Sequence, residues 1–143
     1  MAQIKRHASV RWAGTGKDGT GSMTTQSGTL KDTPYGFNAR FGDGKGTNPE
    51  ELIAAAHAGC FSMAMAFQLS GAGHTPDSLD CVANLTMEQI PGGWKIAAIH
   101  LVLKAKVPGL EDAKFEELAK GAKDNCPVSQ VLNAVITLDA TLS

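Results

Sequence analysis

The sequence has almost no net charge, and it lacks the segments of an exported or membrane-spanning chain. Its 13 Lys and Arg residues nearly balance 14 Asp and Glu residues, for a formal net charge of -1. This leaves no electrostatic basis for binding nucleic acid or an anionic membrane. The N-terminus lacks the apolar segment of a signal peptide, and His57 and Gln68 interrupt the longest apolar run. We therefore expect a cytoplasmic protein with no nucleic-acid or membrane partner.

Cysteine is scarce, with only Cys60, Cys81 and Cys126 in the chain. An odd number of widely spaced cysteines, without an export signal, argues against a structural disulfide framework. None lies in a CxxC motif or in a Cys/His cluster with zinc spacing, so no metal site is predicted. The glycines of residues 42–46 do not fit a phosphate-binding loop, and no cofactor is predicted either. Each cysteine is then either a buried small apolar residue or a reactive thiol.

The chain is organised around a long apolar stretch, residues 46–67, which predicts a helix. Asn48 suits the N-cap, Pro49 the first helical position, and Glu50 and Glu51 place negative charge in the first turn. Cys60 lies in the middle of this stretch among Ala and Gly residues, which allow another backbone to approach closely. We interpret the helix as both the core element and the holder of a reactive thiol.

The flanking segments predict an α+β fold, with antiparallel sheets packed against helices. We expect strands at residues 3–12, 20–30, 37–41, 79–89, 94–106 and 134–142, a turn at residues 31–36, and further helices at residues 111–123 and 128–133. The strand at residues 94–106 is apolar on both faces, so it should be central and covered on both sides. With no repeat and no linker, residues 1–143 should form a single domain.

Cys126 directly precedes Pro127, which suits the first position of a short helix. Cys126 is therefore an N-cap candidate, whose sulfur would face free backbone N–H groups and the positive end of the helix dipole. Asn125 or Ser129 can complete such a cap. The alternative is a cysteine that only fills a corner of the core.

Cys60 needs a cationic partner if it is to react, because apolar surroundings raise the pKa of a thiol. The candidates by residue type are Arg40, Arg11, Arg6, Lys45 and His57. His57 lies one turn before Cys60 on the same face of the predicted helix, so it could contact the sulfur. The alternative for His57 is a packed helix histidine.

Two motifs together resemble the osmotically inducible protein C (OsmC) family. They are GTNPEELIAAAHAGCFSMA at residues 46–64 and NCPVSQ at residues 125–130. The segment YGFNARFGDGKG at residues 35–46 is similar to this branch of the family rather than to its sister branch, the organic hydroperoxide resistance (Ohr) proteins. The resemblance spans nearly the whole chain.

The resemblance implies a redox-active cysteine enzyme of stress defence, a peroxiredoxin-like antioxidant that reduces organic hydroperoxides and, less well, hydrogen peroxide. Cys60 matches the peroxidatic cysteine and Cys126 the resolving one, so a Cys60–Cys126 disulfide is implied. Glu50 and Arg40 match the glutamate and arginine of the site. The family fold is an intertwined homodimer with two interfacial active sites. Its reductant is an external dithiol, associated in the family with lipoylated proteins.

Helix geometry adds an expectation about the site. Ten residues separate Glu50 from Cys60, which in a straight helix amounts to about 15 Å along the axis. A glutamate side chain cannot span that distance. Either the helix bends, or Glu50 serves the Cys60 of a second chain. We favour the second possibility, in which two central helices cross at a dimer axis and each site is composite.

Two other functions deserve comparison with the peroxidase. A non-enzymatic stress or ligand-binding protein on the same fold would not need Cys60, Cys126, Arg40 and Glu50 together. A thiol hydrolase of the papain type would need a convincing Asn or Asp behind its histidine, and it would leave the second motif cysteine without a role. The presence of all four residues favours the peroxidase.

Overall fold

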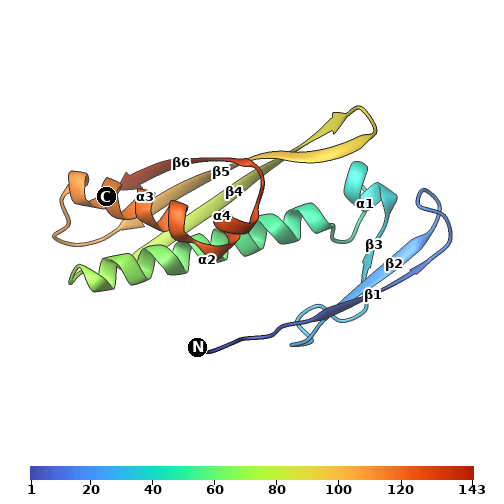
Figure 1. Cartoon of the computed structure of the whole chain (residues 1–143), viewed down its shortest axis with the longest axis horizontal. Coiled ribbons are helices and arrows are strands. Elements are labelled where there is room, and N and C mark those ends of the chain that lie inside the picture. The colour runs from blue at the N-terminus through green and yellow to red at the C-terminus, as the bar shows by residue number, and fades with distance from the viewer. The chain divides into compact units, whose positions relative to one another are not determined.

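The structure, a computed structural model, describes residues 1–143, which form two compact units, Met1–Leu52 and Ile53–Ser143. The long helix α2 (Pro49–Gly71) begins in the first unit and continues into the second (Figure 1). The expectation of a single domain over residues 1–143 stays a prediction.

The first unit contains a three-stranded antiparallel sheet and a short helix. β1 (Ala8–Ala13) pairs with β2 (Thr20–Thr25), and β2 pairs with β3 (Thr33–Tyr35). Helix α1 (Phe37–Phe41) follows β3. The two longer strands were predicted, with overlong bounds, whereas β3 falls in the segment that was expected to be a turn.

The prediction of a strand at residues 37–41 is wrong, because this segment is the helix α1. The backbone N–H of Arg40 donates to the carbonyl of Gly36 at 3.1 Å, and that of Gly42 to Asn38 at 3.0 Å, as in a helical turn. Phe37 and Phe41 share one face in either conformation, since residues four apart align in both a strand and a helix. Their ring centroids lie 4.9 Å apart. A five-residue pattern could not distinguish the period of a strand from the period of a helix.

The start of α2 agrees with its prediction. Asn48 accepts a hydrogen bond from the backbone N–H of Glu51 through Oδ1 at 2.7 Å, which is the N-cap contact, and Pro49 occupies the first helical position. The Glu51 carboxylate accepts from the Thr47 hydroxyl at 3.0 Å. The Asn48 contact satisfies a backbone N–H that a helix end otherwise leaves unpaired.

The second unit is a sheet with helices on one face. β4 (Ser78–Ile90) pairs antiparallel with β5 (Gly93–Lys106), and β5 pairs with β6 (Val135–Leu142). Helices α3 (Asp112–Asn125) and α4 (Pro127–Val131) lie in the connection between β5 and β6. These elements were all predicted to within a few residues.

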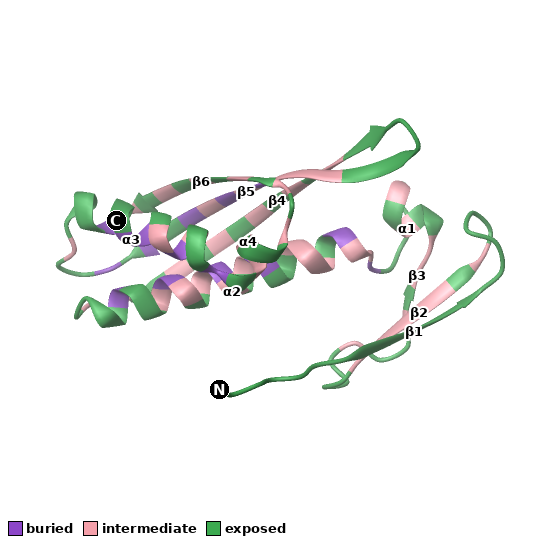
Figure 2. Ribbon diagram, in the orientation of Figure 1, coloured by how far each residue is buried: buried purple, intermediate pink, exposed green.

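The core of the second unit lies between the sheet and the two longer helices, as the purple stretches in Figure 2 show. Alternate residues of β5 point into it, and they pair with the inward residues of both neighbouring strands. Its fully buried side chains include Phe61, Met65 and Leu69 of α2, Ile99, Leu101 and Leu103 of β5, and Phe115 and Ala122 of α3. The buried residues of α2 recur every fourth position, so they form one stripe of the helix.

Two sheet expectations need correction. β5 and β6 are parallel rather than antiparallel. The connection through α3 and α4 returns the chain to the end of the sheet at which β5 begins, so β6 runs in the same direction as β5. β5 is central, as predicted, but the core covers only one of its faces. On the other face Val82 of the neighbouring strand is 58% exposed. The α+β class itself is confirmed.

Helix α2 is long and apolar enough to cross a membrane by length and composition alone, so the expectation that His57 and Gln68 rule this out was wrong. One such helix is weak support for a membrane span, because the core helix of a water-soluble protein passes the same test. The other face of α2 is uncovered in this chain: Met63 is 64% exposed and Phe67 72% exposed. This face of the helix is therefore both apolar and exposed.

Candidate active site

In the first unit, Arg40 of α1 and Glu50 of α2 form a bidentate ion pair. Arg40 donates from Nε to both Glu50 carboxylate oxygens, at 2.9 and 3.1 Å, and from Nη2 to Oε1 at 2.7 Å. The Glu50 side chain is 11% exposed and that of Arg40 40% exposed. Such a fork fixes the orientation of the guanidinium. One edge of Arg40 is thus held by Glu50, while the side chain remains accessible.

The backbone around this pair is fixed by tight contacts. Asn48 donates from Nδ2 to the Ala39 carbonyl at 3.0 Å, which ties the start of α2 to α1. Gly46 has φ +115°, and a Cβ there would lie 2.5 Å from the Pro34 carbonyl oxygen. Only glycine fits this conformation and this close approach. The glycine-rich segment before α2 therefore serves to place Glu50 against Arg40.

An aromatic cavity of about 250 Å³ adjoins Arg40 in the same unit. Its lining includes Trp12, Tyr35, Phe37 and Phe41 together with Arg40. Trp12 and Tyr35 contact each other at a centroid distance of 5.4 Å, and the Arg40 guanidinium lies 5.1 Å from the ring centroid of Phe41. The cavity combines apolar walls with one oriented cation.

In the second unit, the two motif cysteines meet. The Sγ atoms of Cys126 and Cys60 lie 2.8 Å apart, although 66 residues separate them in the chain. Both are free thiols, and Cys126 is fully buried while Cys60 is partly exposed. Cys60 lies in α2, and Cys126 joins α3 to α4. The structure thus brings together the pair that the motifs singled out.

The surroundings of Cys60 act on its ionisation in opposite directions. Burial raises the pKa of the Cys60 thiol most, and the hydrogen bond with Cys126 raises it further. The backbone N–H of Val128, in the first turn of α4, donates to the sulfur and lowers the pKa. Because the raising effects dominate, the thiolate of Cys60 needs a further stabilising charge.

The start of α4 differs in detail from its prediction. Cys126 is the N-cap residue and Pro127 occupies the first turn, as expected, but no side chain caps the helix. Asn125 instead donates to the carbonyl of Gly121 at 2.9 Å, and Ser129 bonds to His57. The first turn of α4 is directed at Cys60 through the Val128 N–H rather than at Cys126.

His57 is a fully buried polar residue of α2. Its Nε2 lies 2.7 Å from the Ser129 hydroxyl of α4, while its Nδ1 is buried without a hydrogen-bond partner. Burial lowers the pKa of His57, which keeps the imidazole neutral near pH 7. Of the two interpretations of His57, the packed helix histidine describes its position. Its hydrogen bond to α4 could not be predicted.

The protein should lose stability as the pH falls below about 6.5, the ordinary pKa of histidine. Burial depresses the pKa of folded His57, so the unfolded chain takes up the proton first and acid favours unfolding, by up to about 1.4 kcal/mol per pH unit. Urea unfolding at pH 7.5 and 5.5 measures this loss, which should shrink in His57→Gln but not in a variant of the exposed His7. An unchanged loss in His57→Gln would contradict the assignment.

Cys81 lies on β4, outside the two cysteine motifs, and packs against the core of the second unit. Burial raises the pKa of its thiol, with a smaller opposing effect from the Ser62 side chain. This environment suits an inert thiol, as expected for a cysteine outside the two motifs.

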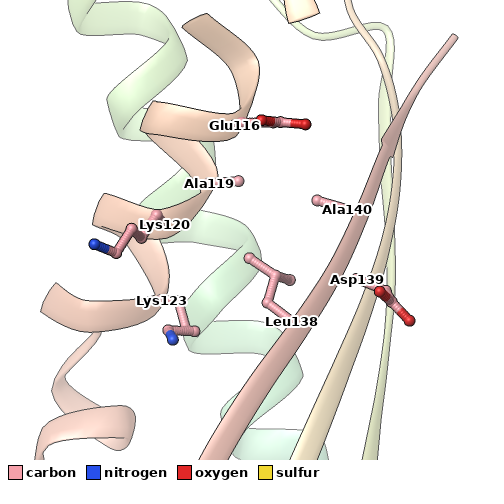
Figure 3. A pocket seen from close by; sticks show the side chains of 7 residues that line it. All are labelled: Glu116, Ala119, Lys120, Lys123, Leu138, Asp139 and Ala140. Atoms are coloured by element: carbon pink, nitrogen blue, oxygen red, sulfur yellow. The ribbon is translucent and has the colours of Figure 1, made fainter. Parts of the chain in front are cut away.

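A larger cavity of about 380 Å³ lies between α3 and β6 and is shown in Figure 3. Charged side chains of both signs line it, among them Glu116, Lys120, Lys123 and Asp139. No cysteine lines this cavity, so it is not a site of thiol chemistry. No cluster of three or more His, Cys, Asp or Glu side chains suited to a metal ion is present.

Known proteins resemble this chain along most of its length. Residues 42–141 match the OsmC-like protein family. The chain is 48% identical to the peroxiredoxin OsmC of Escherichia coli K12 over 139 residues, which cover 97% of each chain. It is 35% identical to the organic hydroperoxide resistance protein of Xanthomonas axonopodis pv. citri over 101 residues, 70% of this chain and 69% of that one.

A solved structure extends the likeness to the fold. The crystal structure of the organic hydroperoxide resistance protein OhrB of Bacillus subtilis superposes with a TM-score of 0.70 at 27% identity, covering 94% of this chain and 98% of that one. The family match and the identity to the Escherichia coli protein confirm the resemblance that the two cysteine motifs predicted. The chain belongs to the OsmC-like protein family.

Proposed function

We propose that this protein is a thiol-dependent peroxidase that reduces organic hydroperoxides, and hydrogen peroxide less well, in stress defence. The observation that carries the proposal is the 2.8 Å contact between the sulfurs of Cys60 and Cys126. Two thiols so close can become a disulfide with little movement of the backbone. This conversion requires a two-electron oxidant, and a peroxide is such an oxidant. The names of the relatives, a peroxiredoxin and organic hydroperoxide resistance proteins, agree with this chemistry.

Cys60 is the thiol that attacks in this proposal, since it is partly exposed whereas Cys126 is fully buried. A sulfur–oxygen bond forms as the O–O bond breaks, and the alkoxide takes a proton and leaves as the alcohol. Cys60 is left as a sulfenic acid. Cys126 then attacks the Cys60 sulfur, the disulfide forms and water leaves. An external dithiol, such as that of a lipoylated protein, returns two electrons and restores both thiols.

Arg40 is the charge that the Cys60 thiolate requires. A guanidinium held by Glu50 on one edge can present its remaining N–H groups to a thiolate and to a peroxide oxygen. The adjoining cavity with Trp12 and Phe37 gives an organic hydroperoxide an apolar surface that hydrogen peroxide cannot use. This supports a preference for organic substrates.

We further propose that a homodimer completes each site. Glu50 and Cys60 lie ten residues apart in one helix, so they are about 15 Å apart along its axis. An antiparallel second copy of α2 would bring the Arg40–Glu50 pair of one chain to the cysteine pair of the other. The uncovered face of α2, with Gly59, Met63 and Phe67, is apolar and includes small residues that allow close helix crossing.

Mixing two inactive variants tests the composite site. Arg40→Met and Cys60→Ser should each be nearly inactive alone. In a mixed dimer one site would combine the intact Cys60 of one chain with the intact Arg40 of the other. Equal amounts, unfolded and refolded together, should therefore regain about a quarter of wild-type activity, because about half of the dimers are mixed and each has one intact site. Refolding either variant alone is the control, and no gain on mixing would place both residues of a site in one chain.

Steady-state peroxide consumption tests the function itself. Cumene hydroperoxide and hydrogen peroxide should be compared as substrates, with dihydrolipoamide and thioredoxin as alternative reductants. The proposal requires faster consumption of cumene hydroperoxide. Consumption of neither peroxide with any dithiol would favour the alternative, a non-enzymatic stress or ligand-binding protein on the same fold.

A further inference from the structure

The polar pair of His57 and Ser129 is not used by the peroxidase chemistry described above. It joins α2 to α4 immediately beside the two cysteines. His57 precedes Cys60 by three residues in α2, and Ser129 follows Cys126 by three residues. The hydrogen bond between them is 2.7 Å long, and the two sulfurs are 2.8 Å apart.

Three contacts therefore connect one face of α2 with the segment that begins at Cys126. They are the Cys60–Cys126 sulfur contact, the Val128 N–H bond to Cys60, and the His57–Ser129 bond. The first two involve the reacting sulfur and must change when Cys60 is oxidised. The His57–Ser129 bond is the one that oxidation leaves in place.

Helix α4 depends on such a contact. It has five residues and none of them is fully buried, although Val128 packs in part against the core, and an isolated helix of this length is unstable in water. Its N-cap residue is Cys126, so any displacement of α4 also displaces the Cys126 sulfur. A contact that holds α4 on α2 therefore holds the resolving thiol near Cys60.

Packing alone does not explain a histidine at position 57. The side chain is fully buried among core residues, and its Nδ1 has no partner. An unpaired buried nitrogen is unfavourable, and an apolar residue of similar volume would avoid it. The hydrogen bond to Ser129 is a contact that an apolar residue could not make.

We propose that His57 and Ser129 are positioning residues that hold α4 so that Cys126 stays within bonding distance of Cys60. The bond favours disulfide formation over loss of Cys126 from the site, without taking part in the attack on peroxide. The part of this role in which Cys126 resolves the Cys60 sulfenic acid formed by peroxide rests on the proposed function. The effect on the Cys60–Cys126 disulfide itself does not.

The test is the equilibrium of the disulfide in glutathione buffers, where oxidised glutathione takes two electrons and becomes two reduced glutathione molecules as the Cys60–Cys126 bond forms. All variants carry Cys81→Ser, so that only the motif thiols remain. The equilibrium constant for forming the Cys60–Cys126 disulfide against glutathione gives the effective concentration of one thiol at the other. Ser129→Ala and His57→Phe should each lower this effective concentration about tenfold. Ser129→Thr keeps the hydroxyl and should keep the effective concentration at the wild-type value. Ser70→Ala, which removes a hydroxyl bonded within α2 to Ala66, is the matched control.

A second measurement separates this role from general loss of structure. With excess cumene hydroperoxide and no reductant, Ser129→Ala should consume the first equivalent at a rate within about twofold of the wild type. It should then accumulate more Cys60 sulfinic acid, two oxygens heavier, at the expense of the disulfide. Equal effective concentrations in Ser129→Ala, His57→Phe and the control would overturn the positioning role. The proposed function would instead be overturned if the wild type consumed no peroxide while Ser129→Ala still weakened the disulfide.

Discussion

Cys60→Ser should abolish the consumption of organic hydroperoxide, with a fall on the order of a thousandfold or more. A serine hydroxyl remains protonated at neutral pH and is a far weaker nucleophile than a thiolate toward the O–O bond. The volume of the side chain hardly changes, and Cys60 is only partly buried, so the fold should persist. The measurement is the rate of cumene hydroperoxide loss with dihydrolipoamide as the reductant.

Cys81→Ser is the matched control for this variant. Cys81 is also a partly buried free thiol, but it packs on the core from β4 and lies outside the two cysteine motifs. Its replacement should leave the rate within about twofold of the wild type. Retained turnover in Cys60→Ser, or loss of turnover in Cys81→Ser, would refute the assignment of Cys60 as the attacking thiol.

Cys126→Ser should allow one fast turnover and then stall. The attack on peroxide needs only Cys60, so the first equivalent of alcohol should form at nearly the wild-type rate. Without a second thiol at 2.8 Å, the sulfenic acid persists and excess peroxide oxidises it to sulfinic acid. Steady-state turnover should therefore fall at least about tenfold. Rapid mixing with one equivalent, followed by intact mass measurement, resolves the two phases.

A different outcome for Cys126→Ser would contradict the resolving role of Cys126. Sustained turnover with a dithiol, at the wild-type rate and without sulfinic acid, would show that the external dithiol reduces the sulfenic acid directly. Cys126 would then be dispensable for the cycle. The proposed attack on peroxide by Cys60 would stand, whereas the resolving step would not.

Local patterns predicted most of the fold because they depend on neighbours along the chain. The capping signals at Asn48 and Pro49 placed the start of α2 correctly, and the apolar residues on both faces of residues 94–106 indicated that β5 is the central strand. The same local reasoning failed for α1, where five residues fit both a strand and a helix. It also could not show that β6 runs parallel to β5, because strand direction depends on the path of the whole connection.

The site divides in a similar way. The Arg40–Glu50 pair and the Cys60–Cys126 pair were singled out by the motifs, and the structure brings the members of each pair into contact. The His57–Ser129 bond was missed because it joins residues 72 positions apart. Ser129 lies within the NCPVSQ motif and was considered only as a cap for its own helix. Periodicity within α2 and α4 carries no information on such a contact.

One stoichiometric measurement tests the central claim most directly. Reduced protein with Cys81→Ser should be mixed with one equivalent of cumene hydroperoxide per chain, without a reductant. The alcohol, the remaining thiols and the peptides are then quantified. The proposed cycle predicts one alcohol per chain, loss of both thiols, a mass lower by about 2 Da, and one Cys60–Cys126 cross-linked peptide. Alcohol formation with both thiols intact, or unreacted peroxide beside a fully reduced pair, would contradict it.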